Sequence, residues 1–472
     1  MENGDQFDGL IQKPRGFRKF AAYLLELLLD RSERMLALTF GGLILIGAYL
    51  LYLPAAQTRN DIRFIDTLFT STSAVCVTGL TTMDTEKDFT RFGQIVILVL
   101  FQLGGLGIMT FAAMGSQMLG RRMSFRSQHM LGDAFFQGHA ATRVRQDLKR
   151  IVAITFLIEA AGAVIIYLDL RNEPGENAPV FSAIFHSVSA FCNAGFSIYG
   201  DNLMSRSDNY GMTYAIMALI ILGGLGHAVV LESARRAWFR SIGRDAKPHM
   251  WSLNTRVVLL SSAGLIVLGA LFIGVSGAFD IGDTWFDGFT NAVFQSITCR
   301  TAGFNTINIG ALPRTALLIM MVLMFIGGSP ASCAGGVKTT SVVTWASQLL
   351  AWLRGRADVT LLGRRLPPEV VARAAMIIGL GVMWCCVGCL VLASLEPDTE
   401  PLNELNLMFE QVSAFATVGL STGVTPLLTS ASKVWIILSM FVGRIGPLTF
   451  AMIVSQRTMG SIRYPEERLM VG

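Results

Sequence analysis

Four segments of the sequence share one pattern, a short apolar run with small hydroxyl side chains that ends in glycine. The copies occupy residues 70–80, 186–196, 295–304 and 410–420, and a large apolar residue follows each glycine. A glycine after a short helix lets the chain extend, so that the carbonyl oxygens at the helix end stay free to bind a ligand. Rings of backbone carbonyl oxygens replace the hydration shell of the ion in potassium filters. The four copies therefore predict one shared site for a monovalent cation.

The residues expected to form this filter are the glycine of each copy, the two residues before it and the one after it. They are Val77, Thr78, Gly79, Leu80, Asn193, Ala194, Gly195, Phe196, Thr301, Ala302, Gly303, Phe304, Thr417, Val418, Gly419 and Leu420. K⁺ is expected at the carbonyl oxygens of Thr78, Ala194, Ala302 and Val418. The third copy is one residue shorter than the others, so a local adjustment is expected there. None of the copies has the full TVGYG sequence of tetrameric potassium channels, which predicts weaker discrimination against Na⁺.

The composition predicts that the four copies lie in a membrane. Hydrophobic residues make up 52% of the 472 residues, charged residues only 15%, and the mean hydropathy is +0.52. Such a chain is more apolar than soluble proteins of its size, so we expect an integral membrane protein. The apolar part of each copy is shorter than the ~20 residues that a membrane-spanning helix needs, which is typical of a re-entrant segment. The expected membrane spans flank the copies at residues 35–53, 92–118, 151–170, 210–231, 257–279, 316–326, 370–395 and 434–454.

The predicted fold class is an all-α membrane protein of four tandem units around one pseudo-fourfold central pore. Each unit is a helix, a pore helix, a filter loop and a second helix, and recurrence of such a pattern indicates an internal repeat. The units are expected at residues 35–118, 151–234, 256–353 and 370–455. The segments outside the units are the connections 119–150, 235–255 and 354–369 and the terminal segments 1–34 and 456–472.

Charge predicts the orientation of the units. Most of the 38 Lys and Arg residues fall in the terminal segments and the three connections. By the positive-inside rule, these segments are cytoplasmic. We therefore expect a multi-pass protein of the cell inner or plasma membrane, with both termini in the cytoplasm. The loops around the copies carry more acidic than basic residues, which would concentrate cations at the outer mouth of a pore.

Glycine and proline interrupt the second span of the third unit, and the interruption is either a kink or a movable plug. Ten residues there cannot hold a regular helix, namely Gly327, Gly328, Ser329, Pro330, Ala331, Ser332, Cys333, Ala334, Gly335 and Gly336. Arg444 lies within the last span, where a charge marks a candidate functional residue, and the alternative is a structural hydrogen bond to loop carbonyls. Lys338 is a second candidate, unless it extends to the cytoplasmic face. Arg300, inside the third copy, is interpreted as a scaffold contact rather than a part of the ion path.

Besides the four copies, three further motifs carry a family resemblance: 327–338 (GGSPASCAGGVK), 443–450 (GRIGPLTF) and 463–472 (RYPEERLMVG). Together they resemble the Trk, Ktr and HKT superfamily of K⁺ transporters. Trk subunits carry extra hydrophobic segments before the first unit, for which residues 1–34 leave no room, so the Ktr branch is favoured. The resemblance implies channel-like K⁺ uptake, activated by Na⁺, and makes residues 327–336 an intramembrane gating loop with Lys338 and Arg444 beside it.

The same resemblance implies the partners of the chain. They are a second copy in a homodimer, the lipid bilayer and a cytoplasmic nucleotide-binding regulatory ring like KtrA, with no nucleic acid among them. The regulatory nucleotide is expected on that ring, and no organic cofactor is expected on this chain.

Other functions fit the sequence less well. An enzyme is not expected, because no His, Cys, Asp and Glu residues cluster at the spacing of a metal site or a triad. Cys386 and Cys389 lie in an apolar run typical of helix packing. A secondary transporter with alternating access also uses broken helices and repeats, but its repeats are commonly inverted. A Trk-type transporter subunit remains the alternative within the superfamily, and a structural membrane protein would not need four re-entrant glycine turns.

Overall fold

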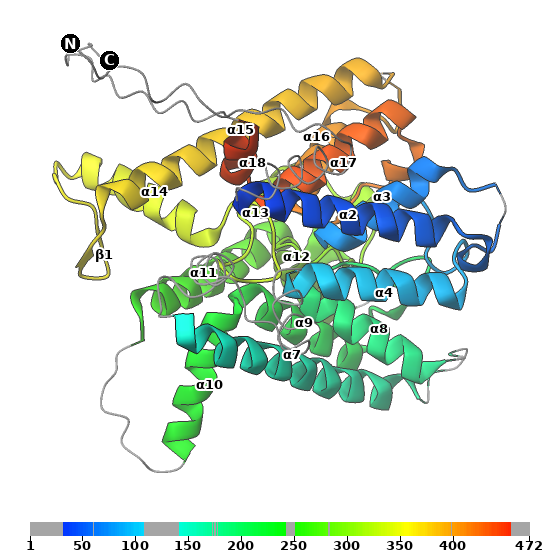
Figure 1. The fold of residues 1–472 in the computed structure, drawn as a ribbon, viewed down its shortest axis with the longest axis horizontal. Coiled ribbons are helices and arrows are strands. Elements are labelled where there is room, and N and C mark those ends of the chain that lie inside the picture. Colours follow the sequence, from blue (N-terminus) through cyan, green and yellow to red (C-terminus); the bar gives the residue numbers. More distant parts are fainter. Residues whose placement is uncertain are drawn as a thin grey trace, which may run out of the picture.

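A computed structural model describes residues 32–454 of the chain except 60, 108–140, 172, 174, 175, 177, 242–250, 282, 283 and 398. Most of the two predicted terminal segments and of the connection at 119–150 lies outside these residues. The described chain is mostly helical, and three kinds of helix alternate along it (Figure 1).

Each unit supplies one helix of each kind. The long first helices are α2 (Ser32–Tyr52), α7 (Ala141–Leu170), α11 (Leu253–Val275) and α15 (Pro368–Leu395). The short helices, which contain the start of the four copies, are α3 (Phe64–Cys76), α8 (Pro179–Cys192), α12 (Trp285–Thr298) and α16 (Glu404–Ala416). The helices after the copies are α4 (Arg91–Leu106), α9 (Tyr210–Leu225), α13 (Arg314–Phe325) and α17 (Ser430–Ile445). Later units continue with α10 (His227–Ser241), α14 (Thr339–Leu353) and α18 (Pro447–Val454). Short 3₁₀ turns are η1 (Pro54–Ala56), η2 (Met204–Arg206), η3 (Ala278–Asp280), η4 (Ile309–Ala311) and η5 (Thr425–Leu427).

A small β-hairpin in the connection 354–369 is an exception to the helical structure predicted. Strands β1 (Thr360–Leu361) and β2 (Arg364–Arg365) pair in antiparallel fashion and project from the helices beside α14 (Figure 1). Leu362 and Gly363, the two residues between them, have φ of +47° and +77°. Positive φ at both central residues is what a two-residue hairpin turn of this hand requires.

Small hydroxyl residues fasten three of the short helices to the first helix of their own unit. Each serine hydroxyl donates a hydrogen bond to a backbone carbonyl oxygen of the first helix: Ser71 to that of Ile44 (2.7 Å), Ser187 to that of Glu159 (2.6 Å) and Ser296 to that of Ile266 (2.8 Å). In the fourth unit the larger Gln411 lies against Gly388, where a Cβ atom would be 2.2 Å from the Gln411 side chain. The three serine hydroxyls therefore let the helices pack closely, and each hydroxyl keeps a hydrogen-bond partner.

Helices of successive units contact one another, and the last unit contacts the first. The contacting pairs are α4 with α8, α9 with α12, α13 with α16 and α17 with α3. The last of these contacts contains an ion pair, in which Lys433 Nζ lies 2.7 Å from Asp66 Oδ1 and both side chains are at most 14% exposed. The beginning and the end of the described chain are thereby joined.

We expect Asp66→Asn to destabilise the protein by about 1–3 kcal/mol, because the largely buried Lys433 ammonium would lose its counterion. Asp358→Asn is the matched control, since Asp358 pairs with Arg365 at 2.9 Å while both side chains are more than half exposed. That change should cost less than ~1 kcal/mol. Thermal unfolding of the purified protein in detergent measures both, and equal shifts would contradict a stabilising role for the Asp66 pair.

The second helices of the second and fourth units are broken, so the predictions of continuous spans at 210–231 and 434–454 are wrong. Helix α9 meets α10 at 107°, and α17 meets α18 at 101°. Gly226 and Gly446 stand at the breaks with φ of +88° and +95°, values that residues with side chains rarely adopt. Helix α4 likewise ends before Gly107, with φ of +80°. The interruption in the third unit is therefore accompanied by glycine breaks in the second and fourth units.

The apolar helices support part of the predicted span count. Among the described residues, three helices are long and apolar enough to cross a membrane, or five if each bent pair is one span. The three are Arg150–Leu170, Leu253–Val275 and Pro368–Leu395. The expected spans 35–53 and 316–326 coincide with the shorter apolar helices Leu36–Tyr52 and Arg314–Phe325. Helix Arg91–Leu106 covers the first part of the expected span 92–118, whose residues 108–118 lie outside the described ones. Each of the eight expected spans thus has an apolar helix, but length alone establishes fewer crossings.

Candidate functional site

Each short helix is followed by one residue with left-handed backbone. Val77, Asn193 and Thr417 come directly after their helices and have φ of 58°, 56° and 52°. In the third copy Cys299 keeps helical backbone, and the left-handed residue is Thr301 with φ of 72°. A left-handed residue turns the chain out of the helix. The shorter third copy therefore reaches the same turn by a local change.

A hydroxyl residue in each short helix binds the backbone beyond the turn. The Oγ atoms of Ser73 and Ser413 accept hydrogen bonds from the N–H groups of Gly79 (3.0 Å) and Gly419 (3.1 Å). The hydroxyls of Ser189 and Thr298 donate to the carbonyl oxygens of Phe196 (2.8 Å) and Phe304 (2.6 Å). Sequence reasoning noted hydroxyls in the copies but did not assign them this role, although their recurrence in every copy is the signal. They fix the backbone that follows each turn.

The four glycines of the copies approach one another through their backbones. A Cβ atom placed on any of them would lie too close to the carbonyl oxygen of the next unit. The distance from the added Cβ atom to that carbonyl oxygen would be 2.7 Å for Gly79 and Ala194 and 2.8 Å for Gly195 and Ala302. It would be 2.5 Å for Gly303 and Val418 and 2.1 Å for Gly419 and Thr78. The order is cyclic, and all four glycines have positive φ, between +69° and +98°. The four stretches therefore form a closed ring that admits no side chain at these positions.

All four glycines line one cavity of about 260 Å³. Residues after all four copies complete its wall, and those after the first and second copies contribute Asp84 and Asp201. The exposed Lys87 pairs with Asp84 at 3.0 Å, whereas Asp201 accepts its bonds from Ser205. Carboxylates at a cavity mouth raise the local concentration of cations.

The interrupted segment 327–336 folds against the broken helix of the second unit. The N–H groups of Ser329 and Cys333 donate to the carbonyl oxygens of Gly224 (3.1 Å) and Gly223 (3.4 Å). Where the segment begins and ends, the Gly327 N–H donates to the Val337 carbonyl oxygen at 2.9 Å, and this bond closes the segment into a loop. Its other end abuts the fourth copy. A Cβ atom on Gly335 would lie 2.1 Å from the Thr417 hydroxyl, and one on Gly336 would lie 3.1 Å from Ala416.

The two basic residues expected beside the loop both bind it. The Arg444 guanidinium donates to the carbonyl oxygens of Cys333 in the loop and Gly104 at the end of α4. Lys338 Nζ donates to the Ala334 carbonyl at 2.5 Å, so its side chain turns back to the loop instead of extending away from it. Arg444 stands where α4 and α9 have the second glycine of a Gly-Gly pair. The fourth unit thus replaces a glycine with a residue that reaches the third unit.

Arg300 lies in the scaffold. Its side chain is 3% exposed, and Nη1 donates to the Ser262 carbonyl in α11 at 3.0 Å. This contact agrees with the interpretation of Arg300 as a structural residue.

Two buried carboxyl groups were missed by sequence reasoning. Glu159 in α7 is 3% exposed and accepts hydrogen bonds from Gln102 Nε2 at both of its oxygens (3.0 and 3.1 Å). Glu410 in α16 is fully buried and accepts from the hydroxyls of Ser421 and Thr425, which line the 260 Å³ cavity. An acidic residue within an apolar run is the signal that could have found Glu159.

A polar cluster around Glu176 lies beside the cavity. Tyr199, which lines the cavity, and Ser182 donate hydrogen bonds to the two carboxyl oxygens, each at 2.8 Å. Arg206 lies 3.4 Å from Glu176 and stacks over the Tyr199 ring at 3.7 Å. Burial raises the pKa of the Glu176 carboxyl, but the hydrogen bonds from Tyr199 and Ser182 outweigh it and hold this pKa below its usual value.

The lowered pKa makes the contribution of Glu176 to stability depend on pH. The ionised carboxylate stabilises the fold above the unfolded pKa of about 4.3, and this contribution is lost as the pH falls through the folded pKa. Glu176→Gln should therefore lower the melting temperature most near pH 7 and least in acid. Thermal unfolding of both proteins from pH 7 downward measures this, and a pH-independent difference would contradict it.

Comparison with known proteins identifies the family. A family model described as "TrkH: Cation transport protein" matches residues 39–461. The chain belongs to the TrkH family of cation transport proteins. Its relative in Bacillus subtilis strain 168, the Ktr system potassium uptake protein B, is 34% identical across 93% of this chain and 96% of that protein. The potassium/sodium uptake protein NtpJ of Enterococcus hirae is 33% identical across 93% of this chain and 97% of that protein.

A TrkH family member of known structure has the same fold. The crystal structure of the potassium transporter TrkH from Vibrio parahaemolyticus covers 90% of this chain and 85% of its own, with a TM-score of 0.70 and 21% sequence identity. The resemblance to the Trk and Ktr superfamily, inferred from the motifs, is confirmed. Membership of the TrkH family and the apolar helices make this chain a membrane transport protein.

Proposed function

We propose that the chain is the ion-translocating subunit of a potassium uptake system, in which K⁺ passes through the ring of four glycine stretches. One observation carries this proposal, the cyclic approach of each glycine to the carbonyl oxygen of the next unit. The names of two relatives, a Ktr system potassium uptake protein and a potassium/sodium uptake protein, support K⁺ as the ion.

In this proposal the four units surround a pseudo-fourfold pore, and K⁺ binds the carbonyl oxygens of Thr78, Ala194, Ala302 and Val418. Carbonyl oxygens compensate the loss of water from the ion. The hydroxyls behind the turns hold this backbone in place, and the 260 Å³ cavity is the outer vestibule. Four unequal stretches make a less regular filter than four identical chains, so selectivity against Na⁺ is expected to be modest.

The loop 327–336 is proposed as an intramembrane gate that closes the inner end of the filter. Its contact with Thr417 and Ala416 supports a position directly beneath the fourth stretch. Arg444 and Lys338 hold it there through the carbonyl oxygens of Cys333 and Ala334. Charge-assisted hydrogen bonds of this kind contribute about 1.5–3 kcal/mol each, which favours the closed state.

The remaining proposals concern regulation and assembly. We propose Na⁺ as an activator, a homodimer of the chain and a cytoplasmic KtrA-like ring that binds the regulatory nucleotide. The word "system" in the name of the Bacillus subtilis relative supports further components. The distribution of Lys and Arg supports cytoplasmic termini in the inner or plasma membrane.

Flux of ⁸⁶Rb⁺ into proteoliposomes tests the proposal. Vesicles loaded with KCl and diluted into low K⁺ should accumulate ⁸⁶Rb⁺ when they contain the chain lacking residues 329–334, and valinomycin should abolish the accumulation. External K⁺ should compete better than Na⁺. Protein-free vesicles are the control, and uptake no greater than theirs would contradict the proposed transport function.

A further inference from the structure

His227 binds the tip of the loop from the second unit. It is the first residue of α10, directly after the break at Gly226. Its backbone N–H donates to the Ala331 carbonyl at 3.1 Å, and its ring Nδ1 lies 3.0 Å from the same oxygen. Because a carbonyl oxygen only accepts, Nδ1 must carry the ring proton. One loop oxygen therefore receives two hydrogen bonds from one residue.

The loop residue that accepts these bonds has a strained backbone. Ala331 has φ of +57°, a left-handed value that is unfavourable for a residue with a side chain. The second unit also packs tightly against the residue before it, since a Cβ atom on Gly226 would lie 2.6 Å from the Pro330 carbonyl oxygen. Strained residues persist where surrounding contacts hold them. The two bonds from His227 are contacts of that kind.

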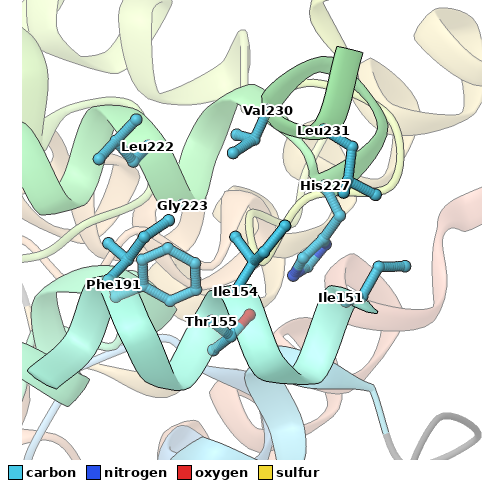
Figure 2. A pocket seen from close by; sticks show the side chains of 10 residues that line it. Ile151, Ile154, Thr155, Phe191, Leu222, Gly223, His227, Val230 and Leu231 are labelled. Atoms are coloured by element: carbon cyan, nitrogen blue, oxygen red, sulfur yellow. The ribbon is translucent and has the colours of Figure 1, made fainter. Parts of the chain in front are cut away.

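The imidazole lies in a mostly apolar environment, and the one hydroxyl among the residues that line the cavity is that of Thr155, which lacks a hydrogen-bond partner among the described residues. Figure 2 shows the ring among side chains of α7 and α10, including Ile151, Ile154 and Leu231, around a cavity of about 10 Å³. His227 is 9% exposed, and among the described residues its Nε2 has no hydrogen-bond partner. If the loop moved away, the Nδ1–H group and the backbone N–H would both lose their acceptor. Leaving buried donors unpaired is unfavourable, so the surroundings oppose that movement.

We infer that His227 is a further positioning residue for the loop, which it holds at Ala331 while Arg444 holds it at Cys333 and Lys338 at Ala334. The inference rests on the proposed gating function. The two residues come from the two broken helices, His227 after the bend between α9 and α10, and Arg444 before the bend between α17 and α18. Helix α10 extends away from the other helices (Figure 1), so a displacement of α10 would pull His227 from the loop.

Substitutions that differ in the position of one donor test this inference. Asn places its amide nitrogen near the position of Nδ1, whereas Gln places it near that of Nε2, and Ala has neither. In the ⁸⁶Rb⁺ assay with the full chain and no partner, His227→Ala and His227→Gln should raise uptake about two- to tenfold, as expected for one neutral hydrogen bond. His227→Asn should stay within twofold of wild type. A packing role would give the opposite order, because Gln is closer to His in size than Asn.

The loop deletion separates this inference from the proposed gate. If removal of residues 329–334 raises uptake and the His227 variants equal wild type, the inference is wrong and the gate stands. If the deletion raises nothing, the gating proposal fails. In the chain that lacks residues 329–334, His227→Ala should add no further uptake. An increase there as large as in the full chain would also overturn the inference. If His227→Ala elutes as an aggregate in gel filtration, the Asn and Gln pair decides.

Discussion

Replacing Gly79 or Gly419 with serine is expected to lower the K⁺/Na⁺ permeability ratio at least about tenfold. The Cβ atom would lie 2.7 Å from the Ala194 carbonyl oxygen in the first case and 2.1 Å from that of Thr78 in the second. Positive φ adds strain at each position, but the change in the ratio comes from the displaced carbonyl ligand, since each ~1.4 kcal/mol lost from K⁺ binding corresponds to a tenfold change. The displaced carbonyl should weaken K⁺ binding most, while a hydroxyl can still serve Na⁺.

Reversal potentials, or K⁺ and Na⁺ competition with ⁸⁶Rb⁺ in proteoliposomes, measure this ratio. Gly363→Ser is the control for strain alone, because Gly363 has φ of +77°, lies in the β-hairpin and would place its Cβ atom in open space. It should leave the ratio unchanged. An unchanged ratio in Gly79→Ser and Gly419→Ser as well would contradict the assignment of these glycines to the filter.

Removing Arg444 is expected to raise K⁺ flux in the absence of the regulatory partner by roughly one to two decades. The guanidinium spans the carbonyl oxygens of Cys333 and Gly104. A charge-assisted hydrogen bond contributes about 1.5–3 kcal/mol to the closed state. Its loss would raise the ratio of open to closed molecules by the corresponding factor of roughly ten to one hundred. Arg444→Ala should show the full effect. Arg444→Lys should show most of it, because one ammonium cannot reproduce the planar fork of donors.

Deletion of residues 329–334 provides an independent variant, since it removes the loop rather than its holder. Both changes should reduce the dependence of flux on the partner. Low, partner-dependent flux in both variants, with normal elution in gel filtration, would make Arg444 a structural residue and the loop a mere kink.

The sequence predicts the four turns and the interrupted segment because their signals are local. Glycine after a short apolar run identifies each turn, and four glycines and a proline within ten residues exclude a helix at 327–336. The shorter third copy also predicts a local change in the backbone. In the structure, this change is the shift of the left-handed residue to Thr301.

The contacts of the loop depend on distant residues, and the breaks are only partly visible in the sequence. Gly226 lies in a run that a regular helix would tolerate, and its positive φ in the folded chain reveals the bend. Gly446 is followed by Pro447, a pair that favours the end of a helix, but the expected span 434–454 ran through it. Arg444 and Cys333 are 111 residues apart, and His227 and Ala331 are 104 residues apart. No local pattern pairs residues at such separations. The resemblance placed Arg444 beside the loop, but its carbonyl partners and the contact from His227 come from the structure.

Anomalous diffraction from crystals grown with Rb⁺ can locate the ion, because Rb⁺ replaces K⁺ and its anomalous signal marks its position. We expect a peak between the carbonyl oxygens of Thr78, Ala194, Ala302 and Val418, and its loss when Na⁺ replaces Rb⁺. The chain offers another polar cavity of about 200 Å³, lined by Asp208 and Asp287 among others. A Rb⁺ peak confined to that cavity, with none at the glycine ring, would contradict the account.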